Sequence, residues 1–68
     1  MDSDEQYFFI ITLQGLEVGL KRTTSTSGVF TGDDDARSRY NKIYEDALSR
    51  SRFPSDETVV VFYHIEKM

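Results

Sequence analysis

One segment near the start of this 68-residue chain constrains its fold more than any other, the octapeptide YFFIITLQ from Tyr7 to Gln14. It is the densest run of aromatic and β-branched side chains in the sequence, and these residue types favour β-strands. Its nearest match is TVVVFYHI, from Thr58 to Ile65. Because a small domain must bury its most apolar segments together, we expect two neighbouring strands, the first of them central in the sheet.

A stretch with two glycines after the first strand predicts a hairpin. The segment GLEVG, residues 15–19, contains two glycines, which can supply the positive φ that a tight reversal needs. A second strand is expected from residue 20 to about residue 27, because its threonines favour extended structure. The charges of Lys21 and Arg22 oppose pairing with another sheet edge, so this strand is expected at an edge. Residues 28–32 are then expected to lead out of the sheet.

The third element is predicted to be a helix. Asp33, Asp34 and Asp35 offer N-caps whose carboxylates also face the positive end of the helix dipole. Pro54 disfavours helical geometry at the residue before it, so the helix is expected to end near Arg52. Its apolar residues recur with the period of one helix face. They are Ala36, Tyr40, Ile43, Tyr44, Ala47 and Leu48.

The order strand, strand, helix, strand predicts an α+β fold with a ββαβ chain path. A crossover through the helix places the third strand beside the first and antiparallel to it, which gives a three-stranded antiparallel sheet of order 2-1-3 with the helix on one face. The alternative order 1-2-3 would leave the most apolar strand at an edge, which favours aggregation. We therefore predict a single domain over residues 7–68, preceded by a disordered acidic tail over residues 1–6.

Alternation along the strands separates the two faces of this sheet. One face is apolar along its whole length and is expected to form the core with the helix. It comprises Tyr7, Phe9, Ile11 and Leu13 of the first strand and Val59, Val61, Tyr63 and Ile65 of the last. The other face is mixed. Its apolar patch is expected to comprise Phe8, Ile10, Val60 and Phe62, bordered by Thr12, Gln14 and His64.

One helix cannot cover both faces, so something else must account for the apolar patch. Three covers are open: the chain itself (residues 28–32, Phe53 or the tail), a second copy or another protein, or a small apolar ligand, for which no convergent polar groups are seen. Burying a phenylalanine or a large aliphatic side chain is worth roughly 1.5–3 kcal/mol. This gain favours a protein partner, contacted by the four apolar patch residues with Gln14 and His64 at the edge.

Composition excludes several classes of protein. The absence of cysteine removes disulfides, thiolate nucleophiles and cysteine-ligated zinc. No apolar run approaches the ~20 residues of a membrane helix, and the acidic start is unlike a signal peptide, so we expect a cytoplasmic protein without membrane contact. The net charge is −4, but residues 7–68 carry 8 basic and 9 acidic groups. This balance lacks the positive footprint of a general nucleic-acid binder.

No arrangement of residues predicts catalysis, a cofactor or a metal. His64 is the only histidine, and neither a nucleophile nor a metal ligand stands at a diagnostic spacing from it. The three consecutive aspartates do not match an EF-hand loop, whose ligands are spread over about twelve residues. Helix capping explains them better. The chain is therefore predicted not to be an enzyme and to need no cofactor.

A small nucleic-acid-binding regulator is the alternative function. It would contact phosphates through basic residues of the second strand and the helix flanks, namely Lys21, Arg22, Arg39, Lys42 and Arg50. However, Asp46 lies four residues from both Lys42 and Arg50, a spacing at which opposite charges pair on a helix. We therefore favour a non-enzymatic protein–protein interaction module, which homodimerises or docks a partner through the uncovered face of the sheet.

Four segments together carry a resemblance: the YFFIITLQ strand, the Thr/Ser-rich second strand, an arginine-containing helix with Ile43-Tyr44-Glu45, and the closing Val60-Val61-Phe62-Tyr63. In these segments the chain resembles short uncharacterised actinobacterial proteins of about this length. The motifs are structural, so the resemblance implies no activity and no role for any residue.

Overall fold

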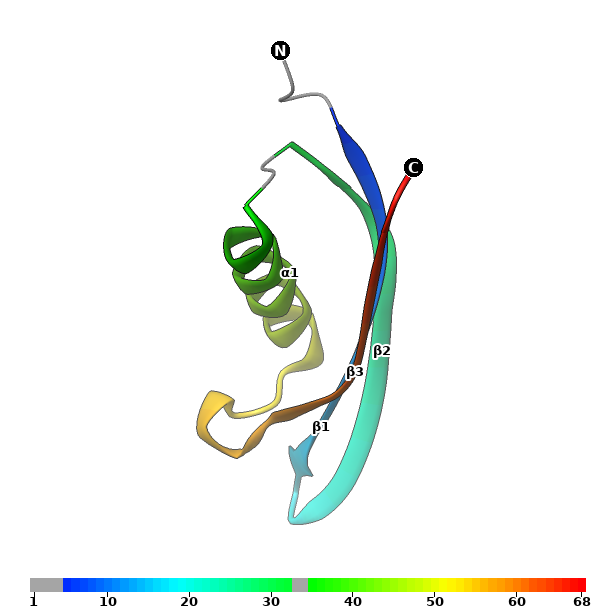
Figure 1. The fold of residues 1–68 in the computed structure, drawn as a ribbon. Helices are drawn as coiled ribbons and strands as arrows, with labels where there is room; N and C mark the ends of the chain where they lie inside the picture. The colour runs from blue at the N-terminus through cyan, green and yellow to red at the C-terminus, as the bar shows by residue number, and fades with distance from the viewer. Residues whose placement is uncertain (1–4, 33–34) are drawn as a thin grey trace.

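The computed structural model describes residues 5–32 and 35–68. Three antiparallel strands, β1 (Gln6–Glu17), β2 (Leu20–Thr31) and β3 (Val59–Lys67), form one sheet in the order β2-β1-β3. The helix α1 (Ala36–Ser51) packs on one face of this sheet and is followed by a 3₁₀ turn, η2 (Ser55–Glu57) (Figure 1). The α+β class, the ββαβ chain path and the strand order predicted from the sequence are confirmed.

β1 and β2 form a long hairpin without irregularities. All twelve residues of each strand are paired with the other. A two-residue turn joins them, and both of its residues, Val18 and Gly19, have positive φ, at 53° and 79°. Positive φ at both positions is typical of a type I′ turn, whose twist matches that of the flanking strands.

β2 continues to Thr31 instead of ending near residue 27, so the prediction that residues 28–32 lead out of the sheet was wrong. Gly28 pairs with Phe9, and a Cβ added at Gly28 would lie 3.5 Å from the Phe9 ring. This glycine therefore lies inside a strand, at an ordinary van der Waals distance from an aromatic ring, and not in a turn. Because the segment belongs to the sheet, it does not cover the face opposite the helix.

The ends of α1 form as the sequence predicts. The Asp35 carboxylate accepts a hydrogen bond from the Ser38 backbone N–H at 2.9 Å, the geometry of an N-cap. Asp33 and Asp34 lie outside the described residues. At the other end Arg52 has a φ of 65° and terminates the helix. Beyond it the chain turns inward, so that the next residue, Phe53, joins the core.

The core lies between α1 and one face of β1. As predicted, β1 buries alternate residues there. Within residues 5–32 and 35–68 the buried apolar residues are Tyr7, Phe9, Ile11, Leu13, Ile43, Ala47 and Phe53. Partly buried Phe30, Tyr44, Leu48, Val60, Tyr63 and Ile65 pack against it. Phe53 therefore lies on the helix side of the sheet and cannot cover the opposite face. Burial raises the pKa of Tyr63, whose ring meets that of Tyr40 edge-on at 4.8 Å.

A bulge in β3 changes which of its residues face the core. Tyr63 pairs with Ile11, but the next inward position of β1, Leu13, pairs with Val60, so Val61 is an extra residue. An extra residue reverses the alternation beyond it. The prediction that Val59 and Val61 are core residues was wrong, since they are 54% and 50% exposed. The placement of Val60 in the patch opposite the helix was also wrong, because it packs against the core.

Polar contacts connect the two chain ends. The Glu5 carboxylate accepts hydrogen bonds from the Tyr7 hydroxyl at 3.1 Å and from Lys67 Nζ at 2.8 Å. The Arg39 guanidinium lies over the Tyr7 ring, 4.3 Å from its centroid. Glu5 and Gln6 therefore belong to the fold, which corrects the predicted tail of residues 1–6; residues 1–4 lie outside the described part of the chain.

These contacts predict a pH dependence that Glu5→Gln removes. The hydrogen bonds from Lys67 and Tyr7 lower the pKa of Glu5 below its ordinary value of 4.5. A carboxyl group with a lowered folded-state pKa stabilises the fold above its unfolded-state pKa, and this contribution is lost as the pH falls through the folded-state pKa. The wild type should therefore melt above Glu5→Gln at neutral pH, and the difference in Tm should vanish in acid.

The matched control for this comparison is Glu45→Gln, which removes a carboxylate from the exposed side of α1. Its Tm should follow that of the wild type across the whole pH range. A difference between wild type and Glu5→Gln that persists unchanged into acid would contradict the role of the Glu5 charge.

Candidate protein-interaction surface

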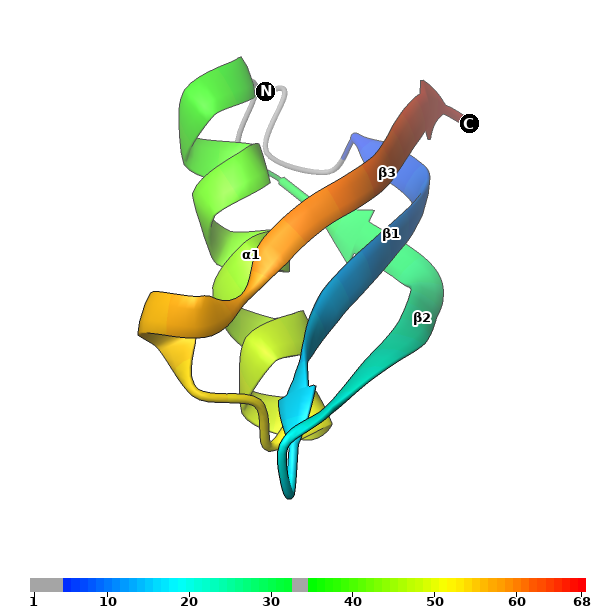
Figure 2. The same ribbon diagram turned by 90° about the horizontal axis from the view of Figure 1, so that it is seen from below.

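The sheet has one face without a described element packed on it, here called the open face. Figures 1 and 2 show α1 on the other side of the sheet. The strand register shows which side chains lie on the open face, because directly paired residues share a face. The open face comprises Phe8, Ile10, Thr12 and Gln14 of β1, Thr23, Ser25, Ser27 and Val29 of β2, and Val59, Phe62, His64 and Glu66 of β3.

Apolar side chains cross the open face diagonally. Val29 of β2 pairs with Phe8 of β1, and Ile10 is the next residue of β1 on the same face. Phe62 of β3 pairs with the residue of β1 that follows on this face, Thr12. We call these four apolar residues, together with Val59, the apolar band. Phe8 is 39% exposed, and Val29 and Phe62 are each 53% exposed. Covering such side chains is worth roughly 1.5–3 kcal/mol each at full burial, so the band is a strong candidate contact.

Polar side chains on both sides of the band already have partners within the sheet. On the β2 side the hydroxyls of Thr12 and Ser25 are 2.8 Å apart. On the β3 side His64 Nε2 lies 3.2 Å from Glu66 Oε1. Burying a polar group is costly when it loses its hydrogen bonds. These pairs lower that cost, because each can stay hydrogen-bonded under a covering surface.

Sequence reasoning located five of the six predicted interface residues on this face. Phe8, Ile10, Gln14, Phe62 and His64 lie there, whereas Val60 does not. The residues that it missed are Val29 and Val59. Val29 could have been predicted, because every second residue of a strand lies on the same face, and the series Thr23, Ser25, Ser27 continues to Val29. Val59 could not have been predicted, because three consecutive valines give no sign that Val59 lies on the open face and not on the core face.

The basic residues of the nucleic-acid alternative lie on different elements and mostly contact other side chains. Lys21 and Arg22 are near the hairpin turn, and Arg22 Nε lies 3.2 Å from Glu17 Oε1. On the helix, Arg50 Nε lies 3.0 Å from Asp46 Oδ2. The remaining two are Arg39, which lies over Tyr7, and Lys42, which is exposed. These ion pairs reduce the positive potential available to a phosphate backbone.

Metal binding and membrane insertion both need features that residues 5–32 and 35–68 would have to supply. Within these ranges no three His, Cys, Asp or Glu side chains are grouped in a way that could hold a metal ion. The one described α-helix lacks the length and apolar character needed to cross a bilayer. Comparisons with protein-family models, with curated proteins and with solved structures found no match to this chain.

Proposed function

We propose that this protein is a non-enzymatic interaction module that homodimerises through its open face. The observation that carries the proposal is the apolar band, with Phe8, Val29 and Phe62 substantially exposed beside a core of seven buried apolar residues in the described part of the chain. A chain this short buries only about 60% of the surface of its unfolded form. An interface that covers the band therefore stabilises both the assembly and the fold.

Two copies fit each other on this face for geometrical reasons. A two-fold axis presents the same residues to each other, so an apolar band meets an apolar band. Sheets packed face to face lie about 10 Å apart and cross at roughly 30°. Because both sheets are twisted, their closest contact follows a diagonal, and the band also crosses the open face diagonally. The electrostatic cost is small, since Glu66 is the one carboxylate among the open-face residues named above.

Phe62→Asp tests this proposal. A carboxylate in the middle of the apolar contact costs enough desolvation energy to weaken the dimer by roughly 100-fold or more. Sedimentation velocity of the wild type at micromolar concentration should give a dimer, and the variant should give a folded monomer. The matched control is Leu20→Asp at the hairpin end, where the wild-type residue is 65% exposed and lies outside the open face. This control should remain a dimer.

Other outcomes would redirect the function. A monomeric wild type whose open face binds a different protein would replace self-association by heterologous docking. Titration with DNA and RNA at two salt concentrations tests the regulator alternative, because phosphate contacts require affinity to fall steeply with salt. A wild type that is monomeric and binds neither another protein nor a nucleic acid would refute the proposal.

A further inference from the structure

The turn of the β1–β2 hairpin exposes two apolar side chains, outside the open face. Val18 is 96% exposed, more than any other large apolar residue in the described part of the chain, and Leu20 is 65% exposed. We call Val18, Gly19 and Leu20 the hairpin tip. Figure 1 shows this tip projecting beyond α1 and beyond the segment that follows the helix. The hairpin tip is therefore an apolar point at one end of the molecule.

Val18 also has an unfavourable backbone conformation. Its φ of 53° lies in the left-handed region, which a β-branched residue rarely adopts. Asparagine or glycine is preferred at the first position of a type I′ turn, and neither would expose an aliphatic side chain there. Strained residues cluster at binding sites, where the strain is offset by the contact that they make. Val18 combines strain with exposure, and a contact made by its side chain would offset both.

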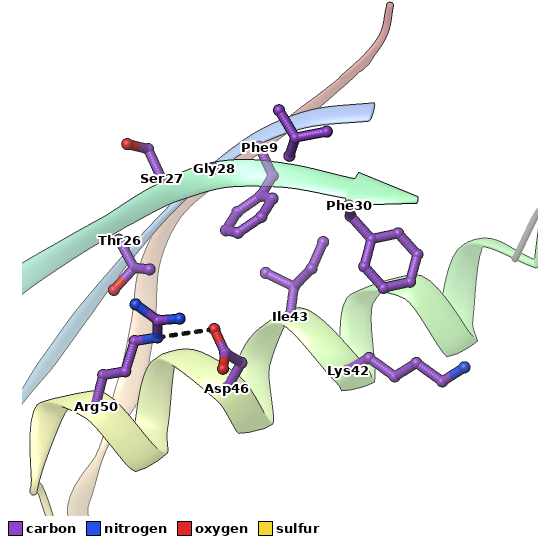
Figure 3. Close-up of a pocket in the computed structure, with 10 residues that line it drawn as sticks. Phe9, Thr26, Ser27, Gly28, Phe30, Lys42, Ile43, Asp46 and Arg50 are labelled. Atoms are coloured by element: carbon purple, nitrogen blue, oxygen red, sulfur yellow. Dashed lines mark ion pairs between the residues drawn. The ribbon is translucent and has the colours of Figure 1, made fainter. Parts of the chain in front are cut away.

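A groove between β2 and α1 differs from the hairpin tip, because its apolar side chains already have contacts within the chain. The groove has a volume of about 460 Å³. Figure 3 shows Phe9, Phe30 and Ile43 directed into the space between the two elements. Phe9 and Ile43 are core residues, and Phe30 packs against them. Covering the groove would therefore remove less apolar surface from water than covering the hairpin tip.

Basic side chains lie directly behind the hairpin tip on both faces of the hairpin. Lys21 and Arg22 are consecutive residues of β2, so their side chains point to opposite faces. Arg22 Nε lies 3.2 Å from Glu17 Oε1. Residues 16–22 carry two basic groups and one acidic group, a local charge of +1 in a chain whose net charge is −4. The hairpin thus ends in an apolar tip with a positive charge on each side.

We propose that the hairpin tip inserts into the surface of a membrane that contains anionic lipids. Val18 and Leu20 enter the interfacial layer, and the basic residues behind them approach anionic headgroups. A membrane fits a projecting tip better than a socket in a protein does, because it supplies apolar and anionic groups on all sides. The expectation of no membrane contact follows from the lack of a ~20-residue apolar run, which a contact at the surface does not need. This contact does not require that the protein dimerise.

Sedimentation with lipid vesicles tests the proposal. The probes are vesicles of phosphatidylcholine with about 30% phosphatidylserine, and vesicles of phosphatidylcholine alone. A single myristoyl chain gives half-maximal binding at about 0.1 mM lipid, and two shorter aliphatic side chains should give it at roughly 1 mM. Binding to the anionic vesicles should exceed binding to the neutral ones several-fold, and this difference should shrink as salt is added.

Variants of the hairpin tip separate insertion from folding. Val18→Asn should weaken vesicle binding by about tenfold, because a polar amide replaces an inserted aliphatic group. Unfolding would not explain this loss, since asparagine suits the turn. Val18→Leu keeps an apolar side chain and should bind like the wild type. Leu20→Asp should lose vesicle binding with its oligomeric state unchanged, which separates the hairpin tip from the open face.

A pair of charge variants tests the role of the basic residues. Lys21→Glu and Arg37→Glu change the net charge by the same amount. Arg37 is exposed at the start of α1, at the opposite end of the molecule from the hairpin tip (Figure 1). Lys21→Glu should weaken binding to anionic vesicles several-fold, whereas Arg37→Glu should bind like the wild type.

Three results would overturn the proposal. The first is a wild type that leaves the anionic vesicles unbound at several millimolar lipid, which would leave a socket in another protein as the partner of the hairpin tip. The second is a Val18→Asn variant that binds vesicles as well as the wild type does. The third is equal weakening by Lys21→Glu and Arg37→Glu, which would assign the binding to the overall charge of the chain.

Discussion

Gly15→Ala should lower the free energy of unfolding by about 1–3 kcal/mol, the cost of overpacking a close-packed core. A Cβ built at this position would lie 2.5 Å from Cγ of Phe53 and 2.9 Å from its Cβ. The clash involves the base of the aromatic side chain, which cannot turn away while its ring stays in the core. Because a small domain has little stability to lose, the variant should unfold at clearly lower urea concentration than the wild type.

Gly28→Ala is the matched control for Gly15→Ala. Both glycines lie inside strands, but at Gly28 the new Cβ would lie 3.5 Å from the Phe9 ring, an ordinary van der Waals distance. Its free energy of unfolding should stay within about 0.5 kcal/mol of the wild type. All variants are compared at one protein concentration, since the proposed dimerisation would make stability depend on concentration.

A double-mutant cycle separates the clash from other effects of the new methyl group. Phe53→Ala removes the ring and costs about 3–5 kcal/mol by itself. In that background Gly15→Ala should cost clearly less, because the two ring atoms nearest to the new methyl group are gone and only the Cβ at 2.9 Å remains. An equal cost of Gly15→Ala in both backgrounds would show that Phe53 does not impose the glycine.

Val18→Asn should raise the free energy of unfolding by about 1 kcal/mol. Val18 has a φ of 53°, a left-handed conformation that costs an ordinary L-residue roughly 1–2 kcal/mol and is least suited to a β-branched one. Asparagine adopts this conformation readily and is preferred at the first position of a type I′ turn. The side chain is 96% exposed, so little packing is lost. Urea unfolding should give a higher midpoint at an unchanged slope.

Val18→Thr distinguishes backbone strain from simple loss of an exposed apolar group. Threonine is also β-branched and nearly the same shape, so the strain remains while the surface becomes polar. This variant should match the wild type in stability. A gain equal to that of Val18→Asn would mean that the backbone conformation of Val18 carries no cost.

The sequence was enough to predict the sheet order and the role of β1, because those follow from strong, regular patterns. Alternation in β1 is unbroken, so Ile11 and Leu13 could be assigned to the core and Phe8 to the open face. The polar β2 could be placed at an edge because an exposed apolar strand would aggregate. The confirmed N-cap at Asp35 likewise follows from local chemistry.

The errors came from features that depend on long-range contacts. Gly28 favours a turn in isolation, but it pairs with Phe9 across the hairpin and lies within β2. Phe53 follows the helix end and could face either side of the sheet; the contact with Gly15 places it in the core. The bulge at Val61 depends on how β3 pairs with Leu13, and a run of three valines contains no alternation to reveal it.

The bulge also has an evolutionary consequence. Since Val59, Val60 and Val61 are the same residue, loss of any one of their codons gives the same shortened chain. That chain keeps one valine opposite Leu13 and one opposite Gln14, and it pairs with β1 without the extra residue. A bulge bends its strand, so such a deletion changes the curvature of β3 and preserves its inward and outward faces. Loss of a single residue here can therefore reshape the open face without exchanging its residues with those of the core.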